Sequence, residues 1–290
     1  MNTVERILPV FSNNYPREVR GAIWNICMAS AMKLELSESN LDNMCCTALV
    51  SGFVGDSGQN EIVKLSKAVG IGHNPDGITS DELLDKIQRV LPFQISFPPF
   101  HGNCLQGLQT KYGVTSNRHI WYLWVMKRIM ELCPDRDSSI VEIGAGFGLL
   151  GYYLDKAGYR DYTTIDIAMA GACQTYFLTK NLPGRNIIIS GDVTDPFDLR
   201  HKDSIKLLHS TDFKDVPKNR FSIMVNMDGL TEYGLAEASK YVQSDCAPML
   251  LSINHEVNEF RVCEIAQTRK LKSRHPFWLR DGYFEELYNS

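Results

Sequence analysis

Several features that mark large protein classes are missing from this 290-residue chain. Its 30 Lys and Arg residues do not outnumber its 34 Asp and Glu residues, so no basic surplus points to nucleic acid. It has no apolar run of the roughly 20 residues that a membrane span needs. Charged residues, Asn and Pro stand near the N-terminus, where a signal peptide would have its apolar core. We therefore expect a cytoplasmic protein with no nucleic-acid partner and no membrane span.

The chain also lacks the cysteine spacing of a structural zinc site. It has eight cysteines but no C-x-x-C pair, and only Cys45 and Cys46 are close in sequence. Neighbouring cysteines are poor disulfide partners, and the others are scattered. The pattern predicts reduced cysteines in the core of a cytosolic protein.

Residues 1–110 have a helical texture and few strand patterns. The clearest helix is expected over 80–91, where Thr79 and Glu82 form a capping box and Pro92 ends the periodic segment. Other helices are expected over 22–36, 41–54 and 61–69. An aromatic loop containing His101 follows. We interpret this region as a helical accessory piece that covers the ligand-binding cleft of the second region.

Residues 111–290 alternate between apolar strand patterns and helix patterns, which is typical of a parallel sheet with helices on both faces. A helix is expected from Thr115 or Ser116 to Cys133, and the C-terminal segment is expected to form an antiparallel edge. The fold class is therefore α/β, with a Rossmann-like doubly wound sheet that is mostly parallel and contains one antiparallel strand. The other expected strands are 139–143, 162–167, 221–226 and 249–254, and the other helices are 149–157, 169–182 and 230–242.

A glycine cluster stands between the first strand of this region and the following helix. At this place an open α/β sheet binds ligands, and glycines let the backbone approach a bound molecule. The cluster matches G-x-G-x-x-G, the dinucleotide pattern, over 146–151. It also matches E-x-G-x-G-x-G, the loop with which class I methyltransferases bind S-adenosylmethionine. The residues concerned are Glu142, Gly144, Ala145, Gly146 and Gly148.

Glu142 favours the methyl donor over a dinucleotide. A carboxylate just before the strand end would repel a pyrophosphate, whereas it would attract a cationic sulfonium and its free amino group. Asp166, at the end of the next strand, can accept both ribose hydroxyls of either cofactor and does not discriminate. A dinucleotide and a glycine turn without a ligand remain as alternatives.

The motifs resemble those of the bacterial putative sugar O-methyltransferases of the class I fold, over roughly residues 95–290. The resemblance is carried by VEIGAGFGLLGYYL, by the DI strand end with QTYFL in the next helix, and by two strands that end in Asn226 and Asn254. It implies an S-adenosylmethionine-dependent O-methyltransferase that modifies a sugar hydroxyl of a surface glycan or of a nucleotide-linked or small-molecule precursor. The sequence departs from that family after Asp166, where a proline is missing, and around Glu232.

Methyl transfer to a hydroxyl calls for a group that removes a proton, near the carboxyl ends of the fourth and fifth strands. The candidates are His255, Glu232, His101 and Asp228. No ligand spacing supports a metal site, so none is predicted. Donor contacts are also expected from Ile167, Asn226 and the residues after strand three.

Two segments compete for the place of strand three. One is 186–190, which would offer Asp192 to the adenine, and the other is 205–209, which would offer Ser210 or Asp212. We favour the second, because it lies closer in sequence to strand four. The acceptor could instead be another small metabolite, or the chain could be a non-catalytic partner that binds the donor. The oligomeric state stays open, with a homodimer as one option.

Overall fold

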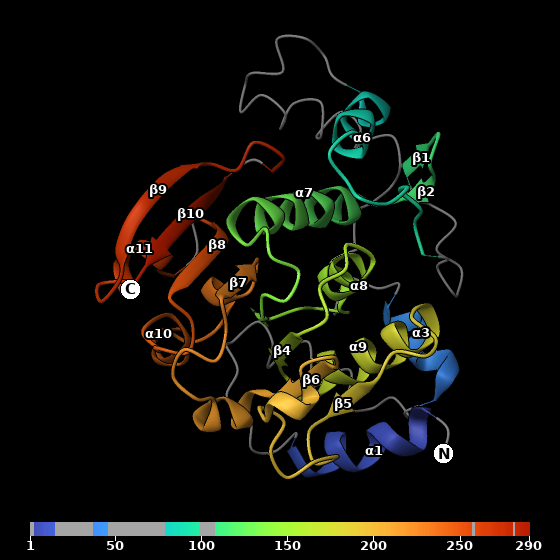
Figure 1. Cartoon of the computed structure of the whole chain (residues 1–290), viewed down its shortest axis with the longest axis vertical. Helices are drawn as coiled ribbons and strands as arrows, with labels where there is room; N and C mark the ends of the chain where they lie inside the picture. The colour runs from blue at the N-terminus through green and yellow to red at the C-terminus, as the bar shows by residue number, and fades with distance from the viewer. Residues whose placement is uncertain (1–2, 15–36, 46–78, 99–107, 257–258, 281) are drawn as a thin grey trace.

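The computed structural model describes residues 3–14, 37–45, 79–98, 108–256, 259–280 and 282–290. Within these ranges the central element is an eight-stranded sheet (Figure 1). Its spatial order is β5-β6-β4-β3-β7-β8-β10-β9, and β10 runs antiparallel to both of its neighbours. The strands are β3 (Ile140–Ile143), β4 (Tyr162–Asp166), β5 (Ile187–Ile189), β6 (Ile205–His209), β7 (Ile223–Met227), β8 (Met249–His255), β9 (Lys270–Pro276) and β10 (Tyr283–Asn289).

This strand order confirms the expected fold class. Apart from the added edge strand β5, the sheet has the Rossmann-like class I methyltransferase arrangement, in which the first strand lies in the middle and the last hairpin supplies the antiparallel strand. The chain reverses its winding direction between β3 and β7, and ligands of such sheets bind at that switch point. The order also answers the question of strand three: β6 pairs with β4 and takes that place, as we favoured, while β5 is the added edge.

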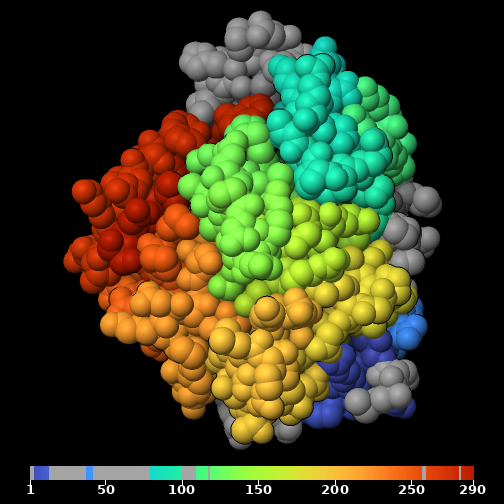
Figure 2. All heavy atoms as spheres, in the orientation of Figure 1, coloured from blue at the N-terminus to red at the C-terminus, as the bar shows by residue number. Residues whose placement is uncertain are grey.

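Side chains alternate between the two faces of the sheet along each strand. Because apolar side chains project from both faces, helices pack on both. Ile140 of β3 packs in a cluster with the helices that precede and follow it in sequence, whereas Val141 and Ile143 pack in a second cluster on the other face. The helices of the first face are α7 (Asn117–Leu132), α8 (Leu149–Lys156) and α9 (Ala168–Asn181); those of the second are α10 (Leu235–Val242) and the short α11 (Val262–Ile265). Figure 2 shows α7 in green between the red C-terminal strands and the teal helix above it.

The described parts of the first 110 residues share the core of the sheet region. Ile7 and Leu41 are buried in the same cluster as α9, and Leu83 and Leu84 pack in the cluster that contains α7. The elements are α1 (Thr3–Asn14), α3 (Glu38–Cys45), α6 (Ser80–Gln88) and a small hairpin of β1 (Leu108–Thr110) and β2 (Gly113–Thr115). The hairpin straddles the expected boundary at 110, which stays a prediction. The expected helices over 22–36 and 61–69 lie outside the described residues.

The capping and stop residues in the sequence predicted most helix ends correctly. The capping box of Thr79 and Glu82 is present at α6, and Ser116 is the N-cap residue of α7. The expected helix over 230–242 is wrong, because it is two elements: the 3-10 turn η4 (Leu230–Glu232) and α10. Tyr233 and Gly234 between them have extended backbone with ψ of 165° and 147°, and α10 begins after that glycine. Two further 3-10 turns are η2 (Leu199–His201) and η3 (Ser210–Asp215).

Candidate functional site

The glycine loop after β3 has a backbone that only glycine adopts easily. Gly144, Gly146 and Gly148 have φ of +73°, +58° and +90°, which is the left-handed region. A Cβ on Gly144 would also lie 3.1 Å from the hydroxyl oxygen of Tyr233. Ala145, between two of these glycines, is buried. The sequence therefore specifies a tight turn that exposes backbone at the carboxyl end of the central strand.

Asp166 and Gln174 hold this loop against the end of β4. The amide of Gly146 donates to Oδ2 of Asp166 at 3.1 Å, and Nε2 of Gln174 donates to the same oxygen at 2.8 Å. Nε2 of Gln174 also donates to the carbonyl of Gly146, and its Oε1 accepts from Thr164. The backbone N–H of Ile167 donates to Oδ1 of Asp166 at 2.8 Å. The carboxylate of Asp166 is thus fixed at the loop, and a carboxylate with about four lone-pair sites still has capacity for more donors.

Glu142 lies on β3, just before the loop, and is fully buried on the face of α7 and α8. Tyr162 donates a hydrogen bond to Oε2, whereas Oε1 is buried with no partner in the described part of the chain. Burial raises the pKa of Glu142 to about 8; the bond from Tyr162 acts in the opposite direction, and the charge of Asp166 adds to the rise. A bare, buried carboxylate oxygen beside the loop is a costly arrangement that a cationic ligand would relieve.

The side chain of Asn226 on β7 forms hydrogen bonds with both neighbouring strands, β3 and β8, near the carboxyl ends of the strands. Its Nδ2 donates to the carbonyl of Ile143 at 2.6 Å, and its Oδ1 accepts from the amide of Leu230 and from Nδ2 of Asn254. Asn254 also donates to Ser252, while its own Oδ1 is buried and meets no donor from the described residues. Asn226 therefore joins β3, β7 and β8, and the bare acceptor at this edge belongs to Asn254.

The residues after β6 lie on the other side of the glycine loop. Oδ2 of Asp212 accepts from the hydroxyl of Ser190 at 2.6 Å and from the backbone N–H of His209 at 3.2 Å. Asp212 and His209 thereby cap η3, whose first residue is Ser210. Ile167 is buried at the end of β4, beside this turn. The structure thus brings Ile167, Ser210 and Asp212 to neighbouring strand ends, where we expected the adenine contacts.

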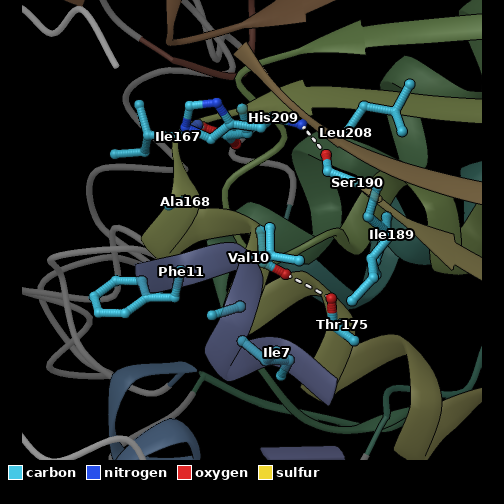
Figure 3. A pocket seen from close by; sticks show the side chains of 14 residues that line it. Ile7, Val10, Phe11, Ile167, Ala168, Thr175, Ile189, Ser190, Leu208 and His209 are labelled. Atoms are coloured by element: carbon cyan, nitrogen blue, oxygen red, sulfur yellow. Dashed lines mark hydrogen bonds between the residues drawn. The ribbon is translucent and has the colours of Figure 1, made fainter. Parts of the chain in front are cut away.

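Helix α1 reaches the same neighbourhood, which the sequence reasoning missed. Val10 and Phe11 line a small cavity together with Asp166, Ile167 and His209. Figure 3 shows Ile7, Val10 and Phe11 on α1, beside Ala168 and Thr175 of α9. The apolar spacing of residues 4, 7 and 11 in the first dozen residues is a helical signal that could have identified this segment.

Asp228 lies directly after β7 and is surrounded by positive groups. Its carboxylate accepts from Nη1 of Arg280, from the hydroxyl of Tyr283 and, at 3.4 Å, from Nη2 of Arg118. Burial by itself would raise the pKa of Asp228, but Arg280 and Arg118 outweigh it, so the pKa is lowered from its ordinary value. The residue has φ of +65°, a conformation that Asp tolerates better than most residues. Its established contacts are those of an anchor for two arginines.

The remaining candidate bases have different surroundings. His255 ends β8, is partly exposed, and its ring lies edge-on to Tyr283 with 5.0 Å between centroids. Glu232 is partly exposed at the end of η4. His101 lies outside the described residues. The structure therefore places Asp228 and His255 around Tyr283, and Glu232 a few residues further along the same connection.

Gln174, which bonds to Asp166, and Arg118, which contacts Asp228, had no assigned chemistry at the sequence level. Gln174 was visible only as part of QTYFL, and Arg118 only as the second residue of a helix. Trp121 and Tyr122 of α7 are buried in the core. Nε1 of Trp121 donates to the carbonyl of Leu279 and so ties α7 to the turn that carries Arg280.

No family model and no curated protein matches this chain. Among solved structures, a protein from Pyrococcus horikoshii OT3 has a TM-score of 0.43 at 12% identity, over 59% of this chain and 89% of its own. Magnesium protoporphyrin IX methyltransferase from Synechocystis PCC 6803, with bound SAM, has 0.42 at 13%, over 59% and 78%. A SAM dependent methyltransferase from Aquifex aeolicus has 0.37 at 15%, over 56% and 87%. The fold assignment rests on the strand order, and the chemistry on the residues described above.

The structure describes no helix that is both long and apolar enough to cross a membrane.

Proposed function

We propose that this chain is an S-adenosylmethionine-dependent O-methyltransferase that acts on a sugar hydroxyl, in a surface glycan or in a nucleotide-linked or small-molecule precursor. The observation that carries the donor assignment is the unpartnered Oε1 of Glu142, buried beside a left-handed glycine loop at the switch point of the sheet. A positively charged ligand beside this group would lower its raised pKa and favour the ionised form, whereas a pyrophosphate would raise that pKa further. The sugar acceptor rests on the resemblance of the motifs.

The residues present fit the methyl donor. Asp166 would accept the ribose hydroxyls, Glu142 would face the cationic methionine part, and the N–H groups of the glycine loop would contact its polar atoms. Ile167, Ser210 and Asp212 would border the adenine, and Asn226 would keep β3 and β7 in register beneath it. When bound, the donor supplies a methyl group on a positively charged sulfur.

The protein's own part in the reaction is to position the acceptor and to remove its hydroxyl proton. We assign the proton transfer to His255, because its partly exposed ring stands at the end of β8, on the same side as Asp228 and Tyr283. Glu232 is the second candidate. Asp228 is the least suited of the three, since its lowered pKa and its two arginine partners keep it a weak base.

Calorimetric titration tests the donor assignment. We expect S-adenosylmethionine and its demethylated product to bind, NAD not to bind, and Asp166→Asn to weaken donor binding by at least tenfold. Asp203→Asn, at an exposed position, is the matched control and should bind the donor like the parent protein. Tight NAD binding without a response to the methyl donor would refute the assignment.

A transfer assay with labelled methyl donor tests the reaction. A panel of sugars, nucleotide sugars and non-sugar hydroxyl compounds identifies the acceptor class, and label in non-sugar compounds alone would replace the sugar assignment. With an acceptor in hand, we expect His255→Gln to lower kcat by roughly a hundredfold or more while leaving donor affinity unchanged. If Glu232→Gln produces that loss instead, the proton belongs to Glu232. Donor binding without transfer to any compound would favour a non-catalytic partner.

A further inference from the structure

Two arginines share one carboxylate next to the glycine loop. Arg118 of α7 and Arg280 of the turn between β9 and β10 both contact Asp228. Gly229, the next residue, has its Cα 3.5 Å from the position that a Cβ on Gly144 would take, so the cluster adjoins the proposed donor site. One carboxylate balances one of the two guanidinium groups, which leaves the cluster with a positive charge.

Arg280 is held in place by two aromatic rings and keeps donors to spare. Its guanidinium carbon lies 4.6 Å from the ring centroid of Trp121 and 3.8 Å from that of Tyr283. Stacking fixes the plane of the guanidinium and leaves its edge for hydrogen bonds. Its side-chain bond to the described residues is the one from Nη1 to Asp228, and about a quarter of the side chain is exposed. The geometry is that of an arginine prepared to bind a planar or tetrahedral oxyanion.

The first turn of α7 adds a second, independent set of donors. Ser116 has the extended backbone of an N-cap residue, but its hydroxyl makes no cap bond. The hydroxyls of Thr115 and Ser116 and Nε of Arg118 are all buried and have no hydrogen-bond partner among the residues that the structure describes. The N-terminus of a 16-residue helix also carries a partial positive charge and free N–H groups. Donors that have no acceptor among the described residues thus lie at the start of the helix that carries Arg118, one of the two arginines of the cluster.

We propose that the acceptor carries an anionic oxygen group, a phosphate or a carboxylate, which binds between the first turn of α7 and Arg280. The identification of this ligand as the acceptor rests on the proposed function, whereas binding of the anion does not. The unpaired hydroxyls of Thr115 and Ser116 and the spare N–H groups of both arginines supply the donors. Asp228 keeps the two guanidinium groups apart and oriented.

Arg274 provides a matched control within the same hairpin. It too stacks on an aromatic ring, with its guanidinium carbon 4.0 Å from the centroid of Phe284. Unlike Arg280, it contacts two carboxylates, those of Glu256 and Glu286. Its charge is therefore compensated, and we expect it to bind no anion.

Titration with inorganic phosphate and with acetate, followed by calorimetry and by the fluorescence of Trp121 under Arg280, tests the proposal. We expect saturable binding of at least one anion, at least tenfold weaker in Arg118→Gln and in Arg280→Gln, and within twofold of the parent protein in Arg274→Gln. Ser116→Ala should weaken binding about threefold. Arg280→Lys keeps a positive charge beside Asp228 and therefore controls for loss of binding that is caused by misfolding. It should bind the anion more weakly than the parent protein but better than Arg280→Gln.

The outcomes separate this inference from the proposed function. No saturable binding of either anion at concentrations up to tens of millimolar, or an equal loss in Arg274→Gln, overturns the anion site even if the methyl donor binds. Anion binding without donor binding keeps the site and refutes the methyltransferase. Phosphate alone, acetate alone or both identify the preferred group. Glucose 6-phosphate, glucuronate and glucose then extend the comparison to acceptors, and methylation of glucose as fast as of the two anionic sugars contradicts the acceptor role.

Discussion

The proposed site has two halves: a donor half at the glycine loop with Glu142, and an acceptor half at Asp228 with Arg118 and Arg280. Each contains a carboxylate that is removed from solvent, but its pKa is raised in the first half and lowered in the second. In the donor half, Glu142 on β3 is fully buried with a tyrosine partner, and its pKa is raised to about 8. In the acceptor half, the side chain of Asp228 after the neighbouring strand β7 is largely buried, with 9% exposed, yet its pKa is lowered because Arg280 and Arg118 outweigh the burial. Burial acts to raise the pKa of both groups: for Glu142 it prevails over the bond from Tyr162, whereas for Asp228 the two arginines outweigh it.

The difference suggests how the two halves divide their ligands. The donor half has an acceptor oxygen without a donor, Oε1 of Glu142, and suits a cation. The acceptor half has donors without acceptors, at Thr115, Ser116 and Arg118, and suits an anion. In a reaction that transfers a methyl group from a cationic donor to an anionic acceptor, each ligand would supply the hydrogen-bond or charge partner that its half of the site needs. The following predictions test this contrast.

Removing the charge of Asp228 should have the largest effect. Asp228→Asn keeps a residue that tolerates positive φ but leaves two partly buried guanidinium groups without a carboxylate, so we expect a loss of about 3 kcal/mol in the free energy of unfolding. Urea unfolding measures the change. Asp245→Asn, which breaks a solvent-exposed pair with Lys218, should cost far less, because solvent screens that pair. Equal costs in the two variants would mean that the arginine cluster contributes no more than a surface pair.

Glu142 should make stability depend on pH in the direction opposite to an ordinary paired carboxylate. The folded protein keeps the proton of Glu142 up to about pH 8, whereas the unfolded chain releases it near its ordinary pKa of 4.5. Stability from this group is therefore complete below pH 4.5 and decreases as the pH rises toward 8, by at most about 1.4 kcal/mol per pH unit. Glu142→Gln should remove roughly 2 kcal/mol of this decrease between pH 6 and pH 8.

The measurement is a series of urea unfolding curves from pH 5 to pH 9. Glu264→Gln, at an exposed carboxylate, serves as the control and should leave the pH dependence across this range close to that of the parent protein. Curves for Glu142→Gln that run parallel to those of the parent protein would show that the carboxylate is already ionised in the folded state.

Gln174 should act as a positioning residue for the donor half. Gln174→Met keeps the side-chain length but removes the bonds to Asp166, to the carbonyl of Gly146 and from Thr164. We expect the Kd for S-adenosylmethionine to rise about tenfold, which corresponds to about 1.4 kcal/mol. Gln267→Met, at an exposed position, should leave the Kd unchanged. If anion binding at Arg280 weakens as much as donor binding, the two halves are not independent.

Removing the hydroxyl of Tyr162 should have the smallest effect. The bond from Tyr162 holds the pKa of Glu142 below the value that burial alone would produce, so Tyr162→Phe should raise that pKa further. At pH 5, where Glu142 is protonated, we expect a stability change of about 1 kcal/mol or less. The pH at which stability stops decreasing should move upward. A downward movement would contradict the assigned role of the hydroxyl.

Local chemistry made much of the donor half predictable. Gly144, Gly146 and Gly148 stand after a short apolar strand, and such a strand–glycine–helix sequence has few other structures available. Asp166 ends the next strand and was expected to face the loop, but its bonds to Gly146 and Gln174 depend on how far α9 lies from β3. The break at Gly234 was missed because apolar periodicity continues across it.

The acceptor half was not predictable in the same way. Arg118 and Arg280 are 110 and 52 residues from Asp228 in sequence, and only the packing of α7 and of the last hairpin against the sheet brings them together. Asp228 and His255 lie at the ends of β7 and β8, where the sequence suggested, but the choice of the base stays a prediction. Their positions in the sequence do not show that Asp228, and not another candidate, contacts two arginines.

The sequence by itself determined the glycine turn, the alternation of strands and helices, and the carboxylates at the ends of β3, β4 and β7, because each depends on residues close together in the chain. The tertiary structure decided which segment is strand three, since that depends on pairing with β4, and it decided the charge of each carboxylate. Glu142 and Asp228 look alike in the sequence. They differ because hydrogen bonds and charges act over a few ångströms of space, and the fold alone determines which groups come that close.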